Sequence, residues 1–196
     1  MFFSKISQEL CQKLCALPGV GEKSAQRICS FVLSQDNSYG LELAKLLEDM
    51  VRSHKNCQVC NILTTEDICR ICQEPSRDRT KLCVVEKSED VYLIEQTREF
   101  AGFYFVLGKL LSPIDGVGLD DIDFPKLRDL AAKREVLEVI LALNPSSEGE
   151  TTMNFIAQKL ANYKITRLAT GLPFGGDLHY TTSMTIASAL RGRRSF

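Results

Sequence analysis

Residues 81–108, "KLCVVEKSEDVYLIEQTREFAGFYFVLG", decide the fold of the larger part of this chain. The segment opens with a short apolar run at 81–86, which predicts a buried strand. A helix is expected over 88–100 with Ser88 as its N-terminal cap, and the apolar run at 102–108 predicts a second strand. A strand, a helix and a strand in this order indicate two parallel strands joined by a crossover.

The same alternation continues toward the C-terminus. After the turn-rich "SPIDGVG", the pattern predicts a helix over 124–135 and a strand over 136–144. A further helix over 148–162 and a strand over 164–170 follow. We therefore expect an α/β body built on a mostly parallel sheet, with helices on both faces.

Four cysteines lie just before this body, in "CQVCNILTTEDICRIC". Cys57, Cys60, Cys69 and Cys72 have the spacing C-x2-C-x8-C-x2-C, in which two turns each present two thiolates to one ion. Four protein ligands leave no open position for water, so we predict one structural Zn²⁺ per chain. A redox dithiol and an iron–sulfur cluster are the alternatives. His54 is interpreted as a surface residue rather than a ligand.

The first part of the chain is predicted to be helical, with helices over 6–16, 23–33 and 39–54. The first two are separated by "LPGVGEK", and together they resemble the helix-hairpin-helix of many DNA-binding proteins. Gly19 and Gly21 permit the tight turn, and amide groups at the start of the second helix can then contact a phosphate.

Two cations extend this predicted DNA-binding site. Lys23 and Arg27 are four positions apart on the second helix, so they share a face and can flank the same nucleic-acid backbone. A glycine turn between two packed helices, with no ligand, is the alternative. The P-loop spacing is absent, so nucleotide binding at this turn is rejected.

Composition sets wider limits. The 196 residues carry a net charge of −1, which argues against a polycation that coats nucleic acid but not against a local basic face. The apolar runs are too short for a membrane span and the start is not a secretory signal, so we expect a cytoplasmic protein. In a reducing compartment the other cysteines are expected to be small buried hydrophobes; they are Cys11, Cys15, Cys29 and Cys83.

The body resembles the Toprim fold, which topoisomerases, bacterial primases and some nucleases share. One signature is an acid at a strand end, here Glu86; another is Asp-x-Asp followed by Glu-Gly after a later strand. Here "NPSSEGE" has Asn144 and Ser146 at the two aspartate positions, followed by Glu148. Magnesium needs carboxylate ligands, so two glutamates alone would make a poor hydrolytic site. The alternative is a metal-dependent nuclease or nicking enzyme that uses Glu86 and Glu148.

The order of the modules resembles the RecR family of bacterial recombination mediators. The motifs are the hairpin, the four-cysteine block, "LLSPIDGVG", "NPSSEGE" and "TRLATGLPFGGDLHY", which together span nearly the whole chain. The resemblance implies a structural zinc, no catalysis, and dimers that assemble into ring-like tetramers. It also implies DNA binding at duplexes and single-strand junctions, with RecO and RecF as partners in loading recombinase. From the family, the resemblance implies only a RecO-facing or a structural role for three acids, Glu86, Glu148 and Glu150.

The resemblance is weaker near the C-terminus. Relatives usually have Arg-Gly where this chain has Thr170-Gly171, and Glu-Tyr where it has His179-Tyr180, and an acid-rich segment in place of "TTSM", which ends at Met184. The family exchanges contacts with a neighbouring subunit there, so the resemblance leaves the strength of the dimer open. A pure interaction adaptor with incidental DNA contact is a third reading. The predicted domains are the head, the zinc finger, the Toprim body and an oligomerisation extension, at 1–53, 54–78, 79–172 and 173–196.

Overall fold

A computed structural model describes residues 4–172 and 175–193. The chain divides into two compact units, Met1–His54 and Lys55–Phe196. The predicted extension 173–196 is therefore described except for 173–174 and 194–196, which lie outside the described residues.

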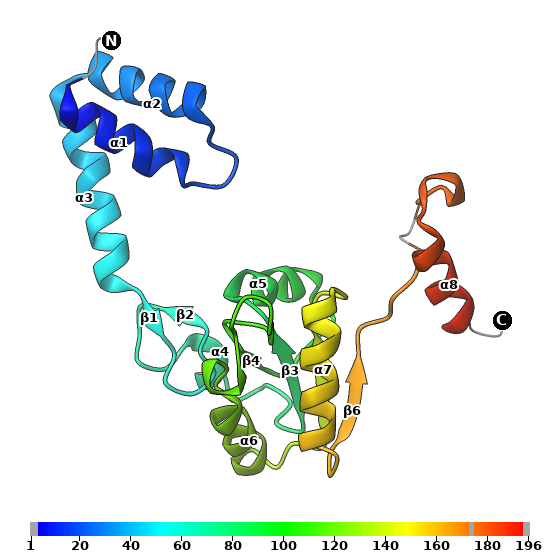
Figure 1. The fold of residues 1–196 in the computed structure, drawn as a ribbon. Helices are drawn as coiled ribbons and strands as arrows, with labels where there is room; N and C mark the ends of the chain where they lie inside the picture. The colour runs from blue at the N-terminus through cyan, green and yellow to red at the C-terminus, as the bar shows by residue number, and fades with distance from the viewer. Residues whose placement is uncertain (1–3, 173–174, 194–196) are drawn as a thin grey trace. The chain divides into compact units, whose positions relative to one another are not determined.

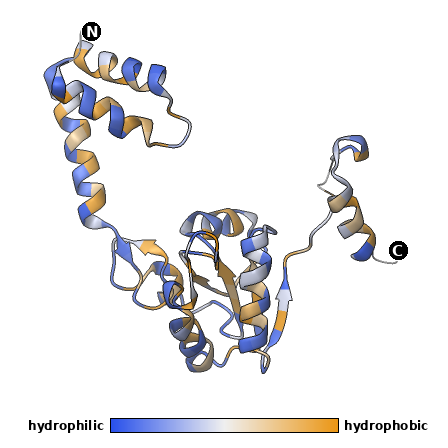
Figure 2. Ribbon diagram, viewed as in Figure 1, coloured by the Kyte–Doolittle hydropathy of each residue, from blue (hydrophilic) through white to orange (hydrophobic). Residues whose placement is uncertain are grey.

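The first unit is a three-helix head, formed by α1 (Lys5–Cys15), α2 (Glu22–Ser34) and α3 (Asn37–Ser53) (Figure 1). These are the three helices that the sequence predicts. α1 packs against α2, and only Ala25 and Cys29 of the described head residues are buried. Large apolar side chains on all three helices stay exposed. Figure 2 colours the hydrophobic residues along these helices orange.

The second unit begins with the four-cysteine segment. Two short antiparallel strands, β1 (Lys55–Asn56) and β2 (Leu63–Thr64), precede α4 (Arg70–Gln73). Three of its cysteines are buried in the same apolar cluster as the large sheet. The zinc-finger segment is thus part of the compact body and not a separate globule.

The body is built on a four-stranded parallel sheet in the order β4-β3-β5-β6. Its strands are β3 (Lys81–Val85), β4 (Phe103–Val106), β5 (Glu138–Ala142) and β6 (Lys164–Arg167). Every residue of β4 is buried, as expected for a parallel sheet covered on both faces. The predicted α/β class with a mostly parallel sheet is confirmed.

Helices connect the strands in sequence order. They are α5 (Ser88–Thr97), α6 (Phe124–Lys133), which follows the short 3₁₀ helix η1 (Leu119–Asp121), and α7 (Ser147–Lys159). The step from β3 to β4 and the step from β4 to β5 run in opposite directions across the sheet. Since such crossovers are right-handed, α5 covers the opposite face from α6 and α7. Phe124 and Phe155 join α6 to α7, with ring centroids 5.2 Å apart.

The predicted cap of α5 is wrong. Lys87 is the N-cap residue, and its backbone N–H donates to the Asp90 carboxylate over 2.9 Å. The Ser88 hydroxyl instead accepts a hydrogen bond from the Leu63 backbone N–H at 2.9 Å. The serine therefore joins the zinc-finger segment to the body, because a more distant donor competes for its oxygen.

After β6 the chain forms the 3₁₀ helix η2 (Leu178–Tyr180) and α8 (Ser183–Arg191). The Thr170 and Ser188 hydroxyls lie 2.9 Å apart, which connects the end of the sheet region to α8. Within residues 4–172 and 175–193, none of the helices has both the length and the apolar character that a membrane span requires.

Candidate functional site

The four predicted zinc ligands come together. The sulfur atoms of Cys57, Cys60, Cys69 and Cys72 all lie within 4.8 Å of one another, and the Cys60 and Cys69 sulfurs are 3.5 Å apart. Tetrahedral zinc with Zn–S bonds of about 2.3 Å places its sulfurs roughly 3.8 Å apart. The donor set and its spacing therefore fit one four-coordinate Zn²⁺ ion.

Local backbone structure prepares the thiolates. The Cys57 sulfur accepts hydrogen bonds from the backbone N–H groups of Val59 at 3.4 Å and Cys69 at 3.3 Å. Asn61, with φ of 63°, closes the first turn through its N–H bond to the Cys57 carbonyl. Hydrogen bonds among the sulfurs themselves lower the pKa of Cys69 and leave the pKa of Cys60 and of Cys72 raised, so they do not favour the thiolate form of all four ligands. The two backbone N–H groups that donate to the Cys57 sulfur orient this ligand and favour its charged form.

The body holds three of the four ligand residues by their backbone carbonyls. Val106, at the end of β4, donates its N–H to the Cys60 carbonyl over 2.9 Å. The Lys126 ammonium lies 3.4 Å from the Cys57 carbonyl, and the Arg134 guanidinium lies 3.5 Å from that of Cys72. The metal centre is thus connected to β4 and α6, which sequence spacing did not reveal.

The predicted hairpin has the geometry its glycines require. Gly19 has a φ of +75°, a conformation that side chains other than glycine rarely adopt, and the turn closes through the Val20 N–H bond to Leu17. Gly21 is the N-cap of α2, and no side chain caps that helix. The first amide groups of α2 therefore remain available to a ligand, as helix starts commonly are for anions.

Lys23 and Arg27 are both exposed on α2. Neither forms an ion pair or a side-chain hydrogen bond within the described part of the chain. They line one side of an open hollow of about 1180 Å³, together with Phe31 of α2 and Tyr39 of α3. These two cations are thus unneutralised beside the uncapped start of the helix.

The predicted Toprim residues also gather. The strand order reverses between β3 and β5, which is where parallel sheets commonly bind ligands beyond the strand ends. Glu86 follows β3, and Asn144 and Ser146 follow β5. With Glu148 of α7 they line a hollow of about 510 Å³.

This hollow is not rich in negative charge. The Lys87 ammonium lies 3.4 Å from the Glu86 carboxylate, and Lys109 also lines the hollow. Among the residues that the structure describes, the four cysteines form the only group of three or more potential metal ligands within mutual reach. Three acids, Glu86, Asp115 and Glu148, line the hollow beside two lysines, but their carboxylates do not lie within mutual reach of one another. They therefore do not reproduce the compact carboxylate set that magnesium prefers.

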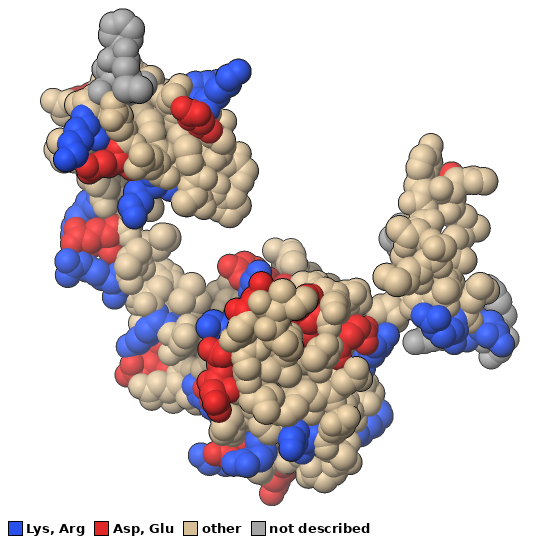
Figure 3. All heavy atoms as spheres, viewed as in Figure 1, with Lys and Arg blue, Asp and Glu red and all other residues tan. Residues whose placement is uncertain are grey.

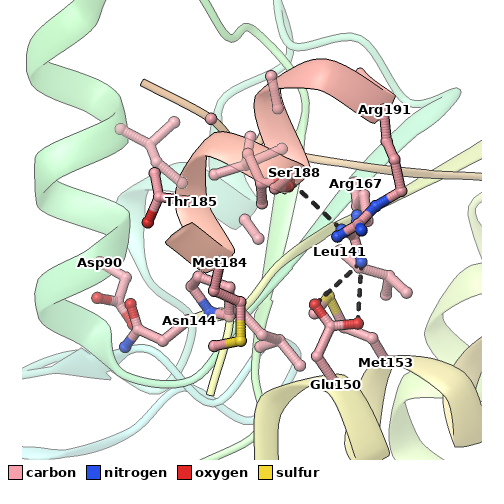
Figure 4. A pocket seen from close by; sticks show the side chains of 18 of the residues that line it. Asp90, Leu141, Asn144, Glu150, Met153, Arg167, Met184, Thr185, Ser188 and Arg191 are labelled. Carbon is pink, nitrogen blue, oxygen red and sulfur yellow. Dashed lines mark hydrogen bonds and ion pairs between the residues drawn. The ribbon is translucent and has the colours of Figure 1, made fainter. Parts of the chain in front are cut away.

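Glu150 belongs to a different cavity. Its carboxylate accepts two hydrogen bonds from the Arg167 guanidinium, at 3.0 and 2.9 Å, as Figure 4 shows. The cavity, of about 760 Å³, also involves Met153 of α7 and Met184 of α8. The structure thus brings Glu86 and Glu148 together but separates Glu150 from them.

Sequence reasoning missed three charged residues of the Toprim hollow, Lys87, Lys109 and Asp115. Asp115 lines it and accepts a hydrogen bond of 2.6 Å from the Ser112 hydroxyl, and Lys109 comes from the same loop. The turn residues of "SPIDGVG" predicted a loop, but they did not indicate that this loop lies over the ends of the strands. Figure 3 shows basic and acidic side chains intermixed over the visible face of this unit.

Comparison with known proteins accounts for this set of sites. The RecR helix-hairpin-helix matches residues 7–51, the RecR four-cysteine zinc finger matches 55–73, and the Toprim domain matches 80–169. This confirms the predicted helix-hairpin-helix, zinc finger and Toprim fold. The predicted zinc is supported both by the finger and by the cluster of sulfurs.

Relatives match along nearly the whole length. The recombination protein RecR of Legionella pneumophila is 47% identical over 186 residues, which is 94% of each chain. The protein of the same name from Acidothermus cellulolyticus is 45% identical over 194 residues, and that from Tropheryma whipplei is 44% identical over 195, each covering 98% of both chains. The chain belongs to the RecR family of recombination proteins.

Proposed function

We propose that this chain is a non-enzymatic, DNA-binding mediator of recombinational repair. In this proposal it forms an oligomeric clamp or scaffold in the cytoplasm that works with RecO and RecF to load recombinase onto gapped single-stranded DNA. One observation supports the DNA-binding part: Lys23 and Arg27 are exposed and form no ion pair within the described residues, and they lie beside the uncapped start of α2.

The physical basis is contact with the DNA backbone. The amide groups and the positive end of the α2 dipole attract a phosphate, and the two cations contact its neighbours. Contacts of this kind carry no sequence information, as a mediator that acts at any gap requires. Repetition of a modest site around an oligomer strengthens binding through avidity.

The absence of catalysis is supported by the Toprim hollow. Asn144 and Ser146 supply no negative charge there, and Lys87 already neutralises Glu86 in part. Two magnesium ions held side by side need several carboxylates to offset their charge. The hollow is better suited to a partner's polar and charged groups than to phosphodiester cleavage.

The three acids then take different roles. Glu86 and Glu148 line the same open hollow, so we propose that they face RecO. Glu150 forms its ion pair with Arg167 and is assigned a structural role. Glu148→Gln is therefore expected to weaken RecO binding more than Glu150→Gln, when RecO binding is measured by calorimetry.

Salt dependence of DNA binding tests the proposal. If Lys23 and Arg27 of four subunits each contact a phosphate, the slope of log K against log salt is about −7 on duplex DNA. Lys23→Glu is expected to reduce the slope and weaken binding without altering the circular dichroism spectrum. Arg128→Glu, an equal charge change on α6, is the matched control. An unchanged slope for Lys23→Glu would contradict the assignment of this surface.

Two other functions have distinct outcomes. A Toprim nuclease predicts strand scission that depends on a divalent ion and disappears in Glu86→Gln. An interaction adaptor predicts normal RecO binding and normal repair in cells when Lys23 and Arg27 are both reversed in charge. The uncompensated cations on α2 favour the DNA-binding mediator over both.

A further inference from the structure

Three cysteines of the head lie outside the zinc centre. Cys11 of α1 and Cys29 of α2 have their sulfur atoms 3.0 Å apart, although the residues are 18 positions apart in the chain. Cys29 is buried, with 2% of its surface exposed, whereas Cys11 is half-buried. Cys15 is exposed one turn after Cys11 on the same helix. Two thiols from different helices are thus already in contact beside an accessible third.

This arrangement does not match a metal site. Within the described residues, Cys11, Cys15 and Cys29 do not form a group of three ligands within mutual reach, unlike the cysteines of the zinc finger. A separation of 3.0 Å is also shorter than the roughly 3.8 Å between thiolates on one tetrahedral zinc. The contact is instead close to the geometry from which a sulfur–sulfur bond forms, at about 2.05 Å.

We propose that Cys11 and Cys29 are a redox modification site that closes reversibly into a disulfide when the protein meets a peroxide. The Cys11 thiolate attacks one peroxide oxygen and the O–O bond breaks, so that Cys11 becomes a sulfenic acid and the leaving hydroxide takes up the proton lost by the Cys11 thiol to give the first water. The Cys29 sulfur then attacks the Cys11 sulfur, and the S–O bond breaks as water leaves with the Cys29 proton. Two thiols and one hydrogen peroxide thus give one disulfide and two waters.

Burial assigns the two roles. Burial and the hydrogen bond with Cys11 raise the pKa of Cys29 to about 11, so that its thiolate is scarce at neutral pH. Cys11 is the more exposed of the two and is therefore the sulfur that meets the oxidant. Cys29 follows because contact between the two sulfurs makes the second step effectively intramolecular.

The disulfide would join α1 to α2 around the hairpin. The closed ring spans 18 positions and contains Gly19 and Gly21. Closing a loop of this length is expected to lower the population of opened head about a hundredfold. Oxidation would therefore stabilise a helix pair that has few buried residues, whether or not the head binds DNA.

Peptide mapping tests the bond directly. Trypsin cuts after Lys5, Lys13, Lys23, Arg27 and Lys45, which places the three head cysteines on separate peptides, 6–13, 14–23 and 28–45. The full-length, zinc-loaded protein is treated with hydrogen peroxide, blocked with N-ethylmaleimide and digested without reduction. We expect 6–13 linked to 28–45, at the mass of the two peptides less two hydrogens, and full reversal by a dithiol.

The competing results are equally clear. A link between 6–13 and 14–23, over-oxidation of Cys11 without a link, or a disulfide-bonded dimer on a non-reducing gel would each overturn the proposal. Zinc content, measured by elemental analysis, is expected to stay unchanged while the bond forms. Release of zinc before any link appears would place the reactive thiols in the finger instead and would also overturn it.

Matched variants separate the roles. Cys15→Ser is expected to keep the link, and Cys11→Ser to abolish it while the head stays folded, because Cys11 is only half-buried. Hydrogen exchange of the α1 and α2 amides is expected to slow about a hundredfold on oxidation of the wild type. It should not change in Cys11→Ser, and slowing in that variant would contradict a Cys11–Cys29 bond.

Discussion

Gly149, in the first turn of α7, packs so close to the carbonyl oxygen of Asn144 that an added Cβ would lie 1.9 Å from it. The obstructing atom belongs to the backbone, so no side-chain rotation can relieve the contact. The glycine therefore lets α7 begin directly over the end of β5, with the Ser146 hydroxyl accepting the Gly149 N–H at 3.1 Å. The close contact thus brings the first turn of α7, with Glu148, next to Asn144 and Ser146 at the Toprim hollow.

Gly149→Ala is expected to destabilise the body, although alanine normally stabilises a helix by up to about 1 kcal/mol relative to glycine. Relief of the clash requires backbone movement, with an expected cost of about 1–3 kcal/mol. Ser147→Ala, two residues earlier and exposed, is the control and should change stability by less than about 0.5 kcal/mol. Urea denaturation measures both. Equal stability of wild type and Gly149→Ala would show that α7 can begin elsewhere.

Loss of one zinc ligand is expected to unfold the finger. Cys57→Ser removes a thiolate and also the sulfur that accepts the N–H groups of Val59 and Cys69. Elemental analysis should find about one zinc per wild-type chain and much less in the variant, since binding of structural zinc contributes directly to folding. Cys15→Ser, at an exposed thiol, should keep its zinc. A stably folded protein without metal would refute the structural role.

Arg134 is expected to matter more than its surface position implies. Its guanidinium lies 3.6 Å from the centroid of the Phe103 ring and 3.5 Å from the Cys72 carbonyl. Arg134→Ala should lower the free energy of unfolding by about 1–2 kcal/mol, and Arg134→Lys should restore little because an ammonium lacks the planar stacking face. Lys133→Ala is the neighbouring control. If Arg134→Lys is as stable as the wild type, the positive charge alone accounts for the contribution of Arg134, and stacking on Phe103 does not.

Restoring the missing acids should create a metal site. Asn144→Asp combined with Ser146→Asp adds two carboxylates to a hollow that already contains Glu148. Because affinity for hard cations rises with ligand charge, Mn²⁺ binding measured by calorimetry is expected to strengthen about tenfold or more over wild type. Asn144→Gln with Ser146→Thr keeps the polarity and adds no charge. Equally tight Mn²⁺ binding by that control would show that charge is not what the hollow lacks.

The sequence predicts those parts of the molecule that depend on local patterns. Apolar runs and helical spacing locate the three helices of the head and the four strands and three connecting helices of the body, and the cysteine spacing identifies the metal ligands. They did not locate the short strands of the finger or α8. Glu86 and Asn144 each follow an apolar run predicted to be a strand, and parallel strands end on the same side of a sheet. These inferences need only neighbours along the chain or the regularity of a parallel sheet.

Contacts between distant residues could not be read in this way. The Ser88 hydroxyl serves Leu63 rather than its own helix, and Glu150 pairs with Arg167 rather than joining Glu148. Lys126 and Arg134 reach the carbonyls of the finger across more than 60 positions. Each depends on where a turn directs a long or polar side chain, which periodicity does not specify. The contact of Cys11 with Cys29 was hidden for the same reason.

The hydrogen bond from the Val106 N–H to the Cys60 carbonyl lies at the edge of the parallel sheet, where the zinc finger covers β4. β4 is an outer strand of the sheet, and its sequence, "FYFV", is wholly apolar or aromatic. If the finger unfolds when zinc is removed, the edge of β4 becomes exposed, and exposed edge strands tend to pair with strands of other chains. After removal of zinc, the protein is therefore expected to form β-rich aggregates that bind thioflavin T. Zinc binding would thus also keep the protein soluble.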